Sequence, residues 1–122
     1  MSVESEIIEA LELLKNERAT REKCKNICAS LGIFLRNNEL GRTQIPVVYY
    51  ILGRCNEQLI NYWGAARAFK KVSMDGNSSE RQSDYASDFI FKFVEKINRE
   101  ILRHQEESDR LWNRRIKMQI TE

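Results

Sequence analysis

The sequence predicts an all-α protein in which antiparallel helical hairpins are followed by a long C-terminal helix. Among 122 residues there are one proline and five glycines, and 42% of the residues are hydrophobic while 31% are charged. This composition is typical of a mostly helical chain. Apolar residues recur three or four positions apart through most of the sequence, which is the spacing of one helix face. The length suits a single domain over residues 1–122.

The first predicted hairpin spans residues 3–37. Its first helix, over residues 3–16, carries an apolar stripe formed by Ile7, Ile8, Leu11 and Leu14. A second stripe runs from residue 21 to about residue 37. In the loop that follows, Gly41 is the expected left-handed residue, and Thr43 is a candidate N-cap for the next helix.

A second hairpin is predicted over residues 46–79, with Asn61 as the N-cap of its second helix. Gly53 lies inside the first of its two helices, where a glycine costs about 1 kcal/mol relative to alanine. We therefore expect the two helices to approach closely at Gly53 and Ala65, with Phe69 filling the space beside them.

This hairpin resembles a tetratricopeptide repeat, whose signature it matches at Tyr49-x2-Leu52-Gly53 and Ala65-x3-Phe69. The match covers a little over a quarter of the chain. The resemblance implies a right-handed array of hairpins that binds other proteins.

Other positions both support the resemblance and depart from it. Asn61-Tyr62 at the turn and Lys71 fit the family, whereas Asn56 stands where a tyrosine is usual and Asn77 where a proline is usual. The sequence leaves open whether residues 3–37 form a degenerate earlier repeat or an ordinary packing hairpin.

Residues 80–120 are predicted to form a capping helix with a C-terminal extension. Ser79 and Gln82 have the spacing of a capping box. The apolar stripe from Tyr85 to Leu102 is expected to cover the last apolar face of the array. Residues 103–110 are polar on every side, and an apolar stripe then returns at Leu111, Trp112, Ile116 and Ile120.

Charge and cysteine usage narrow the class of protein. The 20 basic and 18 acidic residues leave a net charge of +2, so an electrostatic site must be local. No apolar run is long enough to span a membrane, and acidic residues near the N-terminus do not suit a secretory signal. Three cysteines do not form a disulfide framework. We expect an intracellular protein, cytoplasmic rather than nuclear.

Nothing in the sequence predicts catalysis, a metal or a cofactor. The only histidine, His104, lies in the most polar stretch. Cys24 and Cys28 are one turn apart but lack the partners of a zinc site, and Cys55 is remote in sequence. We interpret these three cysteines as small buried hydrophobes. The protein is therefore not expected to be an enzyme.

The resemblance places a partner-binding groove on the first helices of successive repeats. The residues off the packing face there are Val47, Tyr50, Arg54, Glu57 and Gln58. An aromatic residue beside an arginine is typical of a binding hot spot. The alternative is structural: Tyr50 packs against the N-terminal hairpin and Arg54 pairs with Glu57 at the surface.

The C-terminal stripe is the second candidate site, with Leu111, Trp112, Arg115 and Ile116 as expected partner-binding residues. The chain itself, a second copy or another subunit would cover it. A nucleic acid or an anionic membrane surface would instead contact its basic residues, Arg110, Arg114, Arg115 and Lys117. The predicted function is a non-catalytic protein–protein interaction module, an adaptor or a subunit of a larger complex. The alternative function is nucleic-acid binding.

Overall fold

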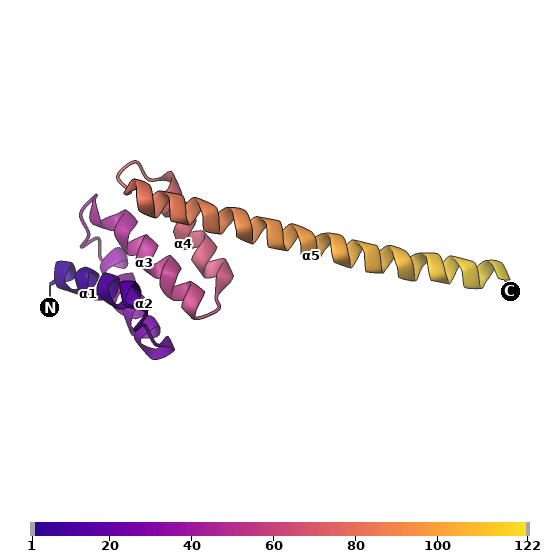
Figure 1. Ribbon diagram of the computed structural model, residues 1–122, viewed down its shortest axis with the longest axis horizontal. Coiled ribbons are helices and arrows are strands. Elements are labelled where there is room, and N and C mark those ends of the chain that lie inside the picture. Colours follow the sequence, from indigo (N-terminus) through magenta and orange to yellow (C-terminus); the bar gives the residue numbers. More distant parts are fainter. Residues whose placement is uncertain (1, 122) are drawn as a thin grey trace. The chain divides into compact units, whose positions relative to one another are not determined.

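The computed structural model describes residues 2–121, with side chains as far as residue 119, and this part of the chain contains helices but no strand. The helices are α1 (Val3–Lys15), α2 (Arg21–Arg36), α3 (Gln44–Gln58), α4 (Tyr62–Met74) and α5 (Glu80–Thr121) (Figure 1). The chain divides into two compact units, Met1–Ile90 and Phe91–Glu122. The predicted all-α class with a long C-terminal helix is confirmed.

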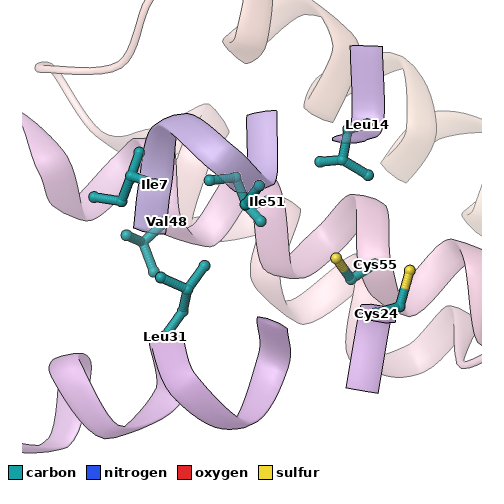
Figure 2. Packing of buried hydrophobic residues seen from close by; sticks show 8 residues of the cluster. Ile7, Leu14, Cys24, Leu31, Val48, Ile51 and Cys55 are labelled. Carbon is teal, nitrogen blue, oxygen red and sulfur yellow. The ribbon is translucent and has the colours of Figure 1, made fainter. Parts of the chain in front are cut away.

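Helix α3 is central to the first unit because it is buried on two faces. One face presents Val48, Ile51 and Cys55, all fully buried, to α1 and α2. Figure 2 shows these side chains among those of Ile7, Leu14, Cys24 and Leu31. On its other side α3 packs against α4. A second buried cluster joins α4 to the start of α5 and is formed by Ala65, Phe69, Val72 and Ala86.

Side-chain caps define where several helices begin. Asn61 accepts a hydrogen bond from the backbone N–H of Gly64 at 3.1 Å, as predicted for the N-cap of α4. The backbone N–H of Gln82 donates to the hydroxyl of Ser79 at 3.2 Å, which is the serine half of the predicted capping box. Thr43 occupies the N-cap position of α3, as predicted, but its side chain makes no cap bond.

Left-handed backbone occurs after the helices, and not at Gly41 as predicted. The positive-φ residues are Glu17, Asn38 and Ile60, each one position beyond the C-cap of α1, α2 or α3. A left-handed residue at this position lets the next N–H reach back into the last turn. After α2, for example, the N–H of Glu39 donates to the carbonyl of Phe34 at 3.1 Å. Gly41 lies too far beyond α2 for this role.

Ile60 gives a direct test of this geometry. Its φ of 59° is costly for a β-branched residue, and its side chain is 64% exposed, so little packing would be lost on its removal. We expect Ile60→Gly to raise the free energy of unfolding by about 1 kcal/mol, measured by urea denaturation. Ile60→Ala, which keeps the Cβ, should gain less. A loss of stability in Ile60→Gly would contradict the left-handed assignment.

Helix α5 covers the second cluster over only a short part of its length. Ala86 is buried in that cluster, and Phe89 and Ile90 pack against it. From Phe91 onward, the predicted covering stripe becomes largely exposed, with Leu102 57% exposed. Within the first unit, the predicted covering role of the stripe falls to Ala86, Phe89 and Ile90.

Candidate partner-binding groove

A groove of about 490 Å³ lies in the first unit between α1, α3 and the first turns of α5. Its volume falls within the usual range of ligand-binding pockets. The side chains that line it come from three helices that are far apart in the sequence: Leu11, Leu14, Lys15, Tyr50, Arg54, Arg81, Gln82 and Tyr85.

Arg54 lies at the centre of a connected polar and aromatic network. Its Nη1 donates a hydrogen bond to the hydroxyl of Tyr50 at 2.7 Å. Its Cζ lies 4.7 Å from the centroid of the Tyr85 ring, close enough for a cation–π interaction. The Tyr85 hydroxyl donates to Oε1 of Glu57 at 2.9 Å, and the same oxygen lies 3.9 Å from Nε of Arg54. Tyr50, Arg54, Glu57 and Tyr85 therefore hold one another in place.

Burial in this network shifts two acidic groups. Desolvation raises the pKa of the Glu57 carboxyl, although the hydrogen bond from Tyr85 and the charge of Arg54 oppose the shift. Desolvation also raises the pKa of Tyr85 to about 12, and the hydrogen bond to Glu57 and its negative charge add to this effect. The neutral phenol is thus the stable form of Tyr85 beside Glu57.

The shift at Tyr85 predicts a loss of stability at high pH. A tyrosine in an unfolded chain has a pKa of about 10, so between about pH 10 and 12 the folded state keeps a proton that the unfolded state has lost. The free energy of unfolding must then fall as pH rises through this window. When the free energy of unfolding is measured by urea denaturation across this pH window, it should fall less steeply with pH in Tyr85→Phe than in the parent protein. Equal slopes in the two proteins would contradict the raised pKa of Tyr85.

The groove also contains groups without partners. Oε1 of Gln82 is shielded from solvent and accepts no hydrogen bond, so the glutamine half of the predicted capping box is not formed through this atom. Lys15 and Arg81 are exposed, and within the described residues neither forms an ion pair.

The structure brings together only part of the predicted groove set. Tyr50 and Arg54 line the groove, and Glu57 joins them through Tyr85. Val47 instead packs against the cluster shared by α1, α2 and α3, and Gln58 is an exposed residue at the end of α3.

The structure also agrees in part with the alternative prediction, in which Tyr50 and Arg54 have structural roles. Arg54 does lie beside Glu57, while the Tyr50 ring is 5.7 Å from that of Tyr85 and 6.2 Å from that of Phe69.

Most of the groove was not found from the sequence. The missed residues come from α1 and α5: Leu11, Leu14, Lys15, Arg81, Gln82 and Tyr85. The available signal was the hairpin order, because α1, α3 and α5 each begin a hairpin or follow one. The first helices of successive hairpins can share one groove, so this order indicates that α1 and α5 contribute to it together with α3.

The C-terminal candidate site lies in the second unit. Leu111 and Trp112 are 61% and 63% exposed, Arg115 is exposed and Ile116 is half-buried. The side chain of Ile120 lies outside those that the structure describes.

The three cysteines lie in the core of the first unit or beside it. Cys24 and Cys55 are fully buried and Cys28 is half-buried. Burial raises the pKa of the Cys24 thiol. Among the described residues, no three or more His, Cys, Asp or Glu side chains are grouped so that they could hold a metal ion. Nor does any helix there combine the length and apolar character needed to cross a bilayer.

Comparisons of the chain with family models, with curated proteins and with solved structures found no match.

Proposed function

We propose that this chain is a non-catalytic protein-interaction module, an adaptor or a subunit of a larger complex, which binds a segment of a partner protein in the groove between α1, α3 and α5. One observation carries this proposal: Arg54 is held against Tyr50 and Tyr85 in a groove that α1, α3 and α5 line together. Arginine and tyrosine in a partly desolvated pocket are the side chains that dominate binding energy in protein interfaces.

A tetratricopeptide-like arrangement is the architecture that we propose for the first unit. Three contacts support it. The Phe69 ring lies against Gly53, Asn61 caps α4, and Nζ of Lys71 donates to the Tyr49 hydroxyl at 3.1 Å. In this arrangement α1, α3 and the start of α5 are the first helices of successive hairpins, and these are the helices that line the groove.

Selection from a library of short random peptides tests the function. The full chain should enrich peptides that bind it, and Arg54→Ala should weaken their binding at least tenfold because it removes the central hot-spot side chain. Arg67, exposed on α4 away from the groove, provides the matched control, and Arg67→Ala should bind like the parent protein. Failure to enrich any peptide, or equal losses in the two variants, would contradict the proposal.

The second unit exposes an apolar stripe, and this stripe favours a second binding surface on the chain. We propose that a second copy of the chain covers it. Apolar residues lie on both sides of the polar stretch 103–110, with Ile101 and Leu102 before it and Leu111 and Trp112 after it. If two copies of this helix packed antiparallel, residues 101–102 of each copy would lie against residues 111–112 of the other. Such an interface is self-complementary.

Light scattering tests this second surface. Trp112→Glu should reduce the assembled mass to that of a monomer while the melting temperature of the first unit stays nearly unchanged. Arg110→Glu, a charge change in the neighbouring polar stretch, should leave the mass unchanged. A monomeric parent protein would contradict the proposal. Salt-dependent binding of RNA or DNA that Arg110→Glu weakens would instead favour the nucleic-acid alternative.

A further inference from the structure

We propose that the groove between α1, α3 and α5 binds an extended acidic segment, in which Asp or Glu side chains flank an apolar residue. The inference rests on the proposed function and adds the chemistry of the partner.

The charges that line the groove favour an acidic partner. The groove is lined by three cations, Lys15, Arg54 and Arg81, and no carboxylate of the described residues lies among its lining side chains. Glu57, which contacts two of the lining side chains, already accepts a hydrogen bond from Tyr85 and lies beside Arg54. Lys15 and Arg81 have no ion-pair partner within the described residues, so they remain available to carboxylates of a ligand. Opposite charges across an interface select the partner and steer its approach.

The apolar side chains of the groove favour a partner that also carries an apolar residue. Leu11 and Leu14 of α1 line the groove together with the rings of Tyr50 and Tyr85. A purely polar ligand would leave this surface uncovered, whereas an aliphatic or aromatic side chain would bury apolar area on both partners. The expected segment therefore carries an apolar residue between its acidic ones.

The mixed lining of the groove decides between chemical classes of anion. A phosphodiester would pair with the cations but would leave the apolar lining side chains uncovered. An extended peptide in which acidic side chains flank an apolar residue satisfies both the cations and the apolar side chains.

The test uses random peptides displayed with their carboxyl ends fused to a coat protein, so that only side chains can supply carboxylates. Peptides selected on the full chain should be enriched in Asp and Glu next to an apolar residue. In fluorescence anisotropy, Arg81→Glu should weaken their binding about tenfold, and added salt should weaken binding to the parent protein. Arg67→Glu, on α4 outside the groove, should leave the affinity unchanged.

Arg81 suits this test because it is exposed in the first turn of α5, where an acidic residue favours the helix dipole. Lys15→Glu, on α1, provides a second charge reversal with the same expected loss of affinity. Selected peptides without acidic enrichment, or affinities that neither charge reversal changes, would overturn this inference and leave the proposed function standing. Absence of any selected peptide would overturn both.

Discussion

Gly53→Leu is expected to lower the free energy of unfolding by about 3 kcal/mol, because close-packed cores respond to added volume with strain. A Cβ on residue 53 would lie 2.5 Å from Cε1 and 2.7 Å from Cδ1 of Phe69, far inside van der Waals contact. The Phe69 ring is fully buried and lies 4.8 Å from the Phe89 ring, so it has no free space into which to move. Urea denaturation of the variant and the parent protein measures the difference.

Gly32 provides the matched control for this substitution. It also lies inside a helix, α2, but a Cβ there would meet no atom within 4 Å. Gly32→Ala should raise the free energy of unfolding by about 0.5–1 kcal/mol, the usual gain from replacing a glycine inside a helix. Overlapping unfolding curves for Gly53→Leu and the parent protein would show that the close contact with Phe69 does not exist.

Ile51→Ala is expected to lower the free energy of unfolding by about 2–4 kcal/mol, the range for large-to-small changes in a core. Ile51 is fully buried on the face of α3 that meets α1 and α2 (Figure 2). Its removal would leave a cavity between the N-terminal hairpin and the rest of the first unit. Thermal and urea unfolding monitored by circular dichroism measure the change.

Ile33 of α2 is the control for Ile51, since it is 47% exposed. Ile33→Ala should change the free energy of unfolding by less than about 1 kcal/mol, as is usual for surface substitutions. Similar effects in the two variants would mean that α3 does not pack against the N-terminal hairpin through Ile51.

Local signals in the sequence were sufficient for the helices and for most of their ends. The caps at Asn61 and Ser79 depend on residues no more than three positions away, and both were predicted correctly. The left-handed residue after α2 was assigned to Gly41 because glycine favours that conformation. The hydrogen-bonding pattern of the helix end requires it at Asn38 instead.

The packing of α3 was only half predictable. The signature residues Tyr49 and Gly53 lie on the side of α3 that meets α4, but a helix between two neighbours buries a second face, here with Val48 and Ile51. Which residues form that second face depends on where α1 and α2 pack, and local periodicity does not contain this information.

The close approach at Gly53 was predicted, but its partner was not. The Phe69 ring, expected beside the contact between Gly53 and Ala65, itself lies against Gly53. The direction of a ring depends on its rotamer within the packed core, which the spacing of residues along a helix does not determine.

The groove shows the same division between local and tertiary information. Tyr50 and Arg54 could be chosen from α3 alone, because one turn of helix separates them. Lys15 and Tyr85 join them only when α1 and α5 pack beside α3. Because Lys15 and Tyr85 are far from Tyr50 and Arg54 in the sequence, local patterns do not predict that these residues lie together.

The central claim is that the groove between α1, α3 and α5 is the binding surface, and amide chemical-shift mapping of the full chain with a selected peptide tests it most directly. The proposal predicts that the shift changes concentrate at groove residues such as Leu11, Lys15, Arg54, Gln82 and Tyr85. Changes confined to α2, to the exposed face of α4 or to residues 91–121, with the groove signals unmoved, would contradict it.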